Sequence, residues 1–127
     1  MMNFFGVIMK SLLLGLVLAM SAALPAAAEN WVHVDESSAT TLYVDGDSIT
    51  PINGGYTYRE MVVSKEDNKV LVAQSQMLCR ERQIRPVAYN LYNRNGKLIK
   101  SRETLNVPFE SIMLETVKAT LWEKLCN

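Results

Sequence analysis

The sequence predicts an α+β fold: an antiparallel β-sheet of about five to six strands, one C-terminal α-helix packed on it, and one disulfide. Three observations support this prediction. Short β-type runs are separated by turn signals, and the last part of the chain alone shows a helical apolar stripe. The chain also contains two cysteines, Cys79 and Cys126.

The first 28 residues have the pattern of a secretory signal peptide. Lys10 precedes an apolar run over residues 11–20, and small residues follow up to Ala28. This order is the one that signal peptidase recognises, and an apolar core of ~10 residues is too short to span a bilayer. We therefore predict that residues 1–28 are cleaved after Ala28, leaving one domain over residues 29–127 in the periplasm or outside the cell.

Two details of the signal bear on location. Met9 and Lys10 begin a complete signal by themselves, so translation from Met1 or from Met9 fits the pattern equally. Neither Ala28 nor Glu29 is a cysteine that could carry a lipid. We therefore expect no stable membrane anchor after cleavage.

The two cysteines predict a structural disulfide. In an exported protein an even cysteine count indicates a disulfide, and Cys79 and Cys126 have only one pairing. Closing the loop between them stabilises the fold by roughly 4 kcal/mol in the chain-entropy model. His33 is the single histidine and no CxxC motif occurs, so we expect neither a metal site nor a cofactor.

The first half of the domain reads as strands and turns. Residues 45–48 form a turn signal in which Asp and Ser side chains can bond nearby backbone amides. In the run 56–63, Tyr56, Tyr58 and Val62 share one face. The predicted strands are residues 31–34, 41–44, 56–63 and 70–79, and residues 49–51 continue toward a second turn signal at residues 53–55.

Residues 86–103 predict a β-hairpin around Asn93–Gly96, for which two turns are available. A two-residue turn pairs Leu91 with Lys100, whereas a type I turn with a bulge at Gly96 pairs Asn93 with Lys97 and Leu91 with Ile99. The bulged turn sets apolar residues opposite each other, so we predict that one. It places Lys100 and Arg102 on the face opposite Leu91.

The last element is a predicted helix over residues 108–125. Proline is tolerated in a first helical turn, and Glu110 complements the positive end of the helix dipole. An apolar stripe indicates the face that covers the sheet. Its members are Leu114, Val117, Leu121, Trp122 and Leu125.

Charge is segregated along the domain. Residues 80–102 hold seven basic residues against one acidic residue, whereas the rest of the domain is acidic. Arginine suits carboxylate, sulfate and phosphate groups because its planar fork can bind two oxygens at once. The candidate partner-binding residues are Arg80, Arg82, Arg85, Lys97, Lys100 and Arg102. We expect a protein or polyanion partner, and the near-neutral composition without a nucleic-acid motif argues against nucleic acid.

Catalysis finds little support in the residues. His33 lies between two valines on a predicted strand, no G-x-S-x-G surrounds a serine, and both cysteines are assigned to the disulfide. Asp45 and Asp47 begin an EF-hand-like pattern whose glycine and terminal Glu are missing. We therefore predict no catalytic site and a protein that is not an enzyme.

The order of several features resembles the bacterial surface-adhesin protein E-like family of small exported proteins. These features are Trp31 at the start of the domain, Tyr43 to Asp45 followed by Asp47 to Ile49, and Cys79 followed by Arg80 and Arg82. The Tyr89 and Tyr92 strand with Asn95-Gly96 comes next, and Trp122 and Cys126 close the pattern. The resemblance implies a single domain with one disulfide, an adhesin-like role and a capacity to form homodimers. Known adhesins of that family are lipid-anchored, whereas we expect no lipid anchor on this chain.

We therefore expect an exported, non-enzymatic binding protein of the bacterial envelope that uses the basic segment 80–102. The alternative is an inhibitor of a periplasmic or host hydrolase such as lysozyme. Because lysozyme is basic, such an inhibitor would present the acidic residues Asp35, Glu36, Asp45 and Asp47.

Overall fold

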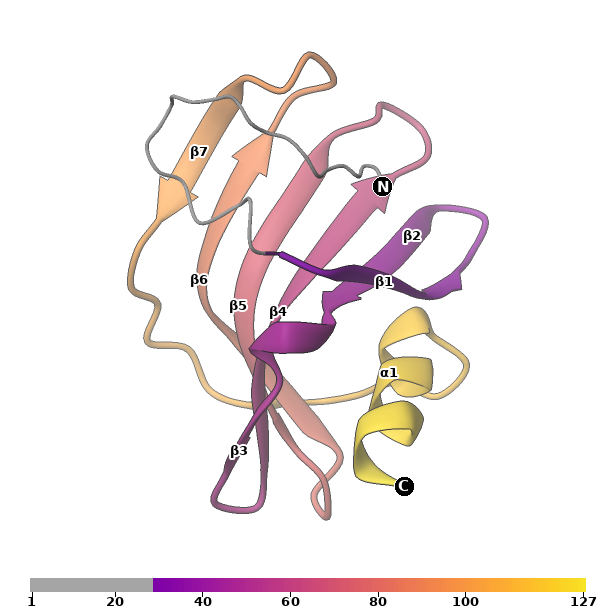
Figure 1. The fold of residues 1–127 in the computed structure, drawn as a ribbon, viewed down its shortest axis with the longest axis vertical. Coiled ribbons are helices and arrows are strands. Elements are labelled where there is room, and N and C mark those ends of the chain that lie inside the picture. Colours follow the sequence, from indigo (N-terminus) through magenta and orange to yellow (C-terminus); the bar gives the residue numbers. More distant parts are fainter. Residues whose placement is uncertain (1–28) are drawn as a thin grey trace.

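The computed structural model describes residues 29–127, so the predicted signal peptide lies outside the described residues. Figure 1 shows a curved sheet with one helix beside it. The elements are β1 (Trp31–Glu36), β2 (Thr40–Asp45), the short 3-10 turn η2 (Gly46–Ser48), β3 (Thr50–Ile52), β4 (Gly55–Ser64), β5 (Val70–Leu78), β6 (Gln83–Tyr92), β7 (Leu98–Arg102), β8 (Glu110–Ser111) and α1 (Val117–Cys126).

All strand pairs are antiparallel, and the main order is β1-β2-β4-β5-β6-β7. The ten-residue strand β4 organises the sheet, because its first residues pair with β3 and its last ones with β2. β8 pairs with the start of β6. The sheet therefore has eight strands, more than the five to six predicted, because the short strands β3 and β8 join it.

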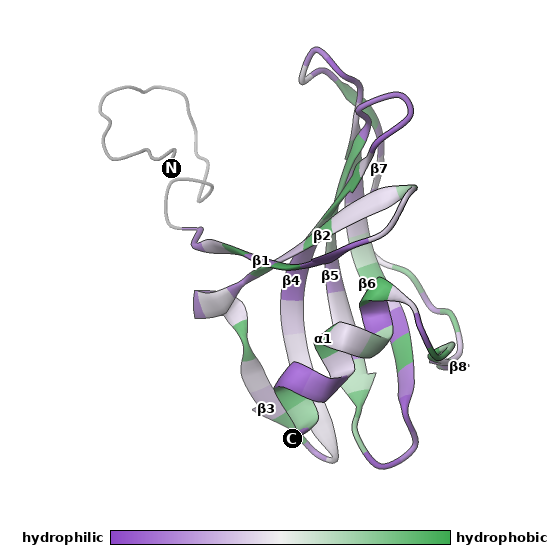
Figure 2. Cartoon of the chain, turned by 90° about the vertical axis from the view of Figure 1, so that its right-hand side faces the viewer, coloured by the Kyte–Doolittle hydropathy of each residue, from purple (hydrophilic) through white to green (hydrophobic). Residues whose placement is uncertain are grey.

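The core lies between the sheet and α1. Figure 2 shows the β1–β2 hairpin turned out of the plane of β4–β7, with α1 in the angle between them. Leu121 of the helix is 1% exposed and belongs to one cluster with Leu42, Tyr58 and Met77. The three residues predicted to share a face in the run 56–63 all contact this core: Tyr58 is fully buried, and Tyr56 and Val62 pack against the cluster.

The helix is shorter than predicted. It begins at Val117, because the Thr116 side chain caps it by accepting a hydrogen bond from the Ala119 amide at 3.2 Å. Glu115 has a φ of +63°, a left-handed conformation that does not continue a right-handed helix. Leu114 is 68% exposed and outside the apolar stripe, whereas Ile112 is buried in the core.

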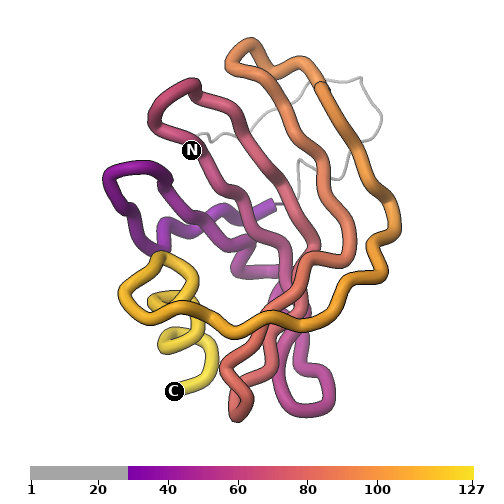
Figure 3. The backbone as a smooth tube through the Cα atoms, turned by 180° about the vertical axis from the view of Figure 1, so that it is seen from behind, coloured from indigo at the N-terminus to yellow at the C-terminus, as the bar shows by residue number. Residues whose placement is uncertain are grey.

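The residues before the helix cross the sheet in extended form. Figure 3 shows this segment leaving β7 at one edge and passing across the lower part of the sheet to reach α1. It contributes β8, and the Ile112 amide donates to the Arg82 carbonyl at 3.0 Å. Glu110 and Ser111, which were predicted to lie in the first turns of the helix, therefore form a strand paired with β6.

The β6–β7 hairpin has the predicted turn but a different pairing beyond it. Gly96 has a φ of +84°, and the Asn93 amide donates to the Lys97 carbonyl at 2.8 Å, as the bulged turn requires. A second irregularity then sets Leu91 opposite Lys100 instead of Ile99. The predicted placement of Lys100 and Arg102 on the face opposite Leu91 is therefore wrong, since directly paired residues share a face. All residues of β7 are exposed, so burial does not select its register.

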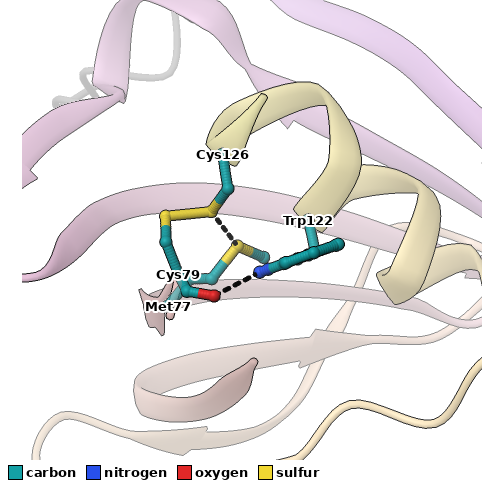
Figure 4. Close-up of a disulfide and its surroundings, with 4 residues drawn as sticks. All are labelled: Met77, Cys79, Trp122 and Cys126. Atoms are coloured by element: carbon teal, nitrogen blue, oxygen red, sulfur yellow. Dashed lines mark hydrogen bonds between the residues drawn. A yellow bond between two sulfur atoms is a disulfide. The ribbon is translucent and has the colours of Figure 1, made fainter. Parts of the chain in front are cut away.

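The disulfide between Cys79 and Cys126 is confirmed, with the two Cα atoms 5.6 Å apart. It fastens the end of α1 to the loop after β5, as Figure 4 shows. The indole Nε1 of Trp122 donates to the Cys79 carbonyl at 2.9 Å, and the Met77 sulfur lies 3.9 Å from that of Cys126. Two contacts besides the covalent bond therefore hold the helix end in place.

Candidate binding surfaces

The basic residues of segment 80–102 form two groups and not one surface. Arg80, Arg82 and Arg85 lie at the β5–β6 turn and the start of β6, whereas Lys97, Lys100 and Arg102 lie at the hairpin tip and on β7. Arg82 directly precedes β6 and Arg85 is near its start, whereas Lys100 and Arg102 of β7 pair with Leu91 and Tyr89 in its second half. In Figure 1 the β5–β6 turn and the β6–β7 hairpin lie at opposite ends of β6.

Two arginines of the first group pack on the domain's own aromatic rings. The Arg82 guanidinium lies 5.0 Å from the ring centre of Trp122, and that of Arg85 lies 4.2 Å from the ring centre of Phe109. Arg85 Nε also donates to Gln76 at 2.9 Å. Such cation–π contacts stabilise the fold and leave these side chains less available to a partner.

The second group lies on an exposed edge strand. We define the β7 edge as Lys97, Leu98, Ile99, Lys100 and Arg102, all of which are exposed. Leu98 and Ile99 are 49% and 50% exposed. Within residues 29–127, β7 pairs with β6 alone, so one side of its backbone is open. The β7 edge thus combines open backbone hydrogen-bonding groups, apolar surface and positive charge.

An apolar groove of about 630 Å³ opens on the helix side of the sheet. Strands β5 and β6 form one wall, and the segment at residues 107–110 and α1 form the other. Its apolar lining includes Leu71, Ile84, Pro86, Tyr89, Leu91 and Val107. Three polar or charged residues, Glu60, Ser75 and Lys118, meet at one end of it.

Glu60 is the centre of this polar end. The residue as a whole is 3% exposed, and its Oε2 accepts hydrogen bonds from Ser75 Oγ at 2.8 Å and Lys118 Nζ at 2.9 Å. Oε1 is buried and has no hydrogen-bond partner among the described residues, and the same holds for the Tyr58 hydroxyl. Burial, and secondarily the Glu60 charge, raises the pKa of Tyr58 well above its usual value of 10.0. The Glu60 carboxylate therefore has one oxygen, Oε1, that can still accept a hydrogen bond.

The prediction of site residues from the sequence missed Glu60, Ser75 and Lys118. Glu60 has the same strand parity as Tyr58 and Val62, so the alternation itself places a carboxylate on the buried face. A charge at an inward position is the signal that could have found it, since buried charges need partners. Its partner Lys118 is 58 residues away in the sequence, so no local sequence pattern indicates that the two residues meet.

The opposite face of the sheet carries a second hollow, of about 530 Å³. There Arg59 forms an ion pair with Glu29 and lies 5.8 Å from the ring centre of Trp31. Burial raises the pKa of the Glu29 carboxyl, and the Arg59 charge opposes this shift. The residue predicted to begin the mature chain is therefore bound to the sheet.

Three of the four acidic residues weighed for an inhibitor serve the fold. Asp45 is 5% exposed and accepts from the Asn30 and Asp47 amides at 3.0 and 3.1 Å. Asp35 accepts from the Thr120 hydroxyl at 2.6 Å, and Glu36 pairs with Lys65 at 3.0 Å. Asp47 is exposed.

His33 has an exposed side chain at 51%, packed edge-on at 5.7 Å against Tyr43. In the described part of the chain, no three His, Cys, Asp or Glu side chains are close enough to hold a metal ion. No helix of residues 29–127 has the length and apolar character needed to cross a bilayer.

Comparison with known families gives a match that covers every described strand and the helix. Residues 31–127 match the model of the family described as Surface-adhesin protein E. The chain belongs to the surface-adhesin protein E family. This confirms the resemblance and supports an adhesin-like binding role for this family member. No curated protein and no solved structure gave a significant match.

Membership also bears on location and chemistry. A surface-adhesin family and a disulfide together indicate an exported protein, because disulfides persist in oxidising compartments. The family points to binding as the activity, and not to catalysis. The family match covers residues 31–127 as a whole and singles out no contact surface.

Proposed function

We propose that this protein is an exported, non-enzymatic binding protein of the bacterial envelope that holds an acidic protein segment along the β7 edge. The observation that carries the proposal is the exposure of a whole edge strand with Lys100 and Arg102 on it. Positive charge alone would mark a solvated surface. Positive charge beside open backbone groups and exposed Leu98 and Ile99 supports a docking strand.

The mode of binding follows from strand geometry. An extended partner segment pairs its backbone with the open side of β7, which supplies affinity that depends little on sequence. Lys100 and Arg102 then select carboxylates, and Arg102 can hold one through two parallel hydrogen bonds. Leu98 and Ile99 supply apolar contact at the hairpin end.

The same charges disfavour pairing between two copies of β7. An antiparallel β7–β7 pair centred on Lys100 sets two lysines opposite each other, and like charges directly opposite are destabilising. The charges thus disfavour this symmetric pair while favouring an acidic partner. We expect a homodimer of this chain to use a different surface.

Arg82 and Arg85 are not part of the proposed surface, since they are held on Trp122 and Phe109. Arg80 is exposed but lies in the turn between β5 and β6, not on β7. For the inhibitor alternative, Asp35, Glu36 and Asp45 are held by contacts within the domain. The β7 edge is therefore the better supported contact surface.

The experiment is a pull-down of envelope and host matrix proteins on immobilised protein. The test variant is K97E/K100E/R102E, and the matched control is K65E/K69E/K124E, which makes the same change in net charge elsewhere on the exposed surface. We expect an identified partner to be retained by the wild type and the control, and lost by the test variant. Equal retention by both variants would contradict the proposal.

A further inference from the structure

We propose that the apolar groove is a binding site for a small amphiphile, an aliphatic chain ending in a primary ammonium group that reaches Glu60. The site lies on the helix side of the sheet and is separate from the open backbone side of the β7 edge. It does not depend on the function proposed for that edge.

The size and walls of the groove suit such a ligand. Its volume of about 630 Å³ falls within the ~300–1,000 Å³ that is usual for small-molecule sites. Leu71, Ile84 and Leu91 offer aliphatic contact along β5 and β6, and Val107 and Pro108 offer it from the crossing segment. Burying an alkyl chain between these walls removes apolar surface of both the ligand and the protein from water.

The polar end determines the head group. Glu60 Oε1 is a buried acceptor without a donor, whereas Oε2 already receives Ser75 and Lys118. A ligand that donates a hydrogen bond satisfies this atom, and a ligand that only accepts does not. The head group must therefore be an ammonium, a hydroxyl or an amide N–H.

Charge favours the ammonium among these donors. Glu60 and Glu110 both line the groove, and Lys118 supplies the one opposing charge of its lining. Lys118 already neutralises part of the Glu60 charge through Oε2, which leaves an excess of negative charge toward Glu110. Lys100 and Arg102 stand opposite Leu91 and Tyr89 on this face, but both are exposed on β7, where solvent screens their charges. A charge-assisted hydrogen bond to Oε1 is stronger than a neutral one.

Calorimetric titration of the purified protein with octylamine, octanol and octanoate tests the proposal at neutral pH, below the concentrations at which these probes form micelles. We expect octylammonium to bind at least about tenfold more tightly than octanoate, with octanol in between. Equal or tighter binding of octanoate would overturn the assignment of the head group. Failure of all three probes to bind would overturn the site.

Two variants locate the binding. Leu91→Gln should weaken both octylammonium and octanol, whereas the matched control Val72→Gln, on the opposite face of the sheet, should not. The double variant E60Q/K118M should bind octanol as before and lose its preference for the ammonium. Preference retained by the double variant would contradict the role of Glu60.

A measurement on the unaltered protein keeps the test independent of variant folding. We expect nuclear Overhauser contacts between the octylammonium methylenes and the methyl groups of Leu71 and Leu91. Contacts to Val72 and Met61 instead would place the ligand in the hollow on the opposite face and overturn the proposal.

Discussion

Glu60 and Lys118 form an ion pair in which one partner is nearly inaccessible to water and the other is partly exposed. The Glu60 side chain is 4% exposed and that of Lys118 is 33% exposed. A buried carboxylate left without its cation carries a large desolvation cost, whereas an exposed pair contributes little. The exposed pair of Lys65 and Glu36 provides the comparison within the same chain.

Lys118→Met should destabilise the protein by about 2 kcal/mol, since it leaves the buried Glu60 charge unpaired while keeping the aliphatic stem. Lys65→Met should cost less than about 1 kcal/mol, because both members of that pair are exposed. Urea unfolding of the two variants measures the difference. Equal losses would show that Glu60 does not depend on Lys118.

Asp35 makes stability depend on pH. The Thr120 hydroxyl and then the Glu36 amide hold the pKa of the Asp35 carboxyl below its usual value of 3.8. A carboxyl whose folded pKa is lowered contributes stability that is complete above the unfolded pKa and is lost as the pH falls through the folded pKa.

Thr120→Val should therefore reduce the loss of stability that the wild type shows between about pH 5 and pH 2. The variant Thr57→Val provides the control, because the Thr57 hydroxyl contacts Ser75 and Gln74 and no carboxylate. Urea unfolding across this pH range gives the three profiles. A Thr120→Val profile as steep as that of the wild type would assign the pH dependence to other carboxyls.

At the scale of elements, α1 depends on its two ends. Thr116 caps its beginning, and the disulfide with the Trp122 indole fastens its last turn. A ten-residue helix is marginal in isolation, so its stability comes from packing and these attachments.

The double variant C79S/C126S should lose roughly 4 kcal/mol of unfolding free energy, according to the chain-entropy model for a loop of this length. Denaturant unfolding followed by tryptophan fluorescence measures the loss, and the reduced wild type should match the variant. A loss below about 1 kcal/mol would mean that Trp122 and the packing of Leu121 hold the helix without the covalent link.

The elements also show what the sequence can predict. Alternation and turn residues located the larger strands, and the Gly96 turn was predicted correctly, because these signals are local. The first residues of the predicted helix failed because a long-range strand pairing and the Thr116 cap override an apolar stripe. The pairing of Leu91 failed because β7 is exposed on both faces. The basic candidates were found by type, but their division between two ends of β6 depends on the folded topology.

At the scale of the molecule, the sheet presents two unlike regions for contact. The β7 edge is exposed and positive, whereas the apolar groove is partly enclosed and contains a buried carboxylate. The family match and the disulfide support export, which places both regions in an oxidising compartment.

Fractionation of the native host with intact-mass analysis tests the processing that we predict for this molecule. The mass should correspond to a chain beginning at Glu29 and lighter than the reduced form by two hydrogens, recovered from the periplasm or the medium. A full-length species in the membrane fraction, or two free thiols, would contradict cleavage or disulfide formation.

The central claim, that the β7 edge is the contact surface, is tested most directly by site-specific photo-crosslinking in the native host. A photoreactive residue replaces Ile99 on β7 or, as the control, exposed Lys69 in the β4–β5 loop. We predict one dominant crosslinked protein from position 99, absent from position 69 and lost when Lys97, Lys100 and Arg102 are changed to glutamate. The same crosslinked protein from both positions, or its persistence after charge reversal, would contradict the account.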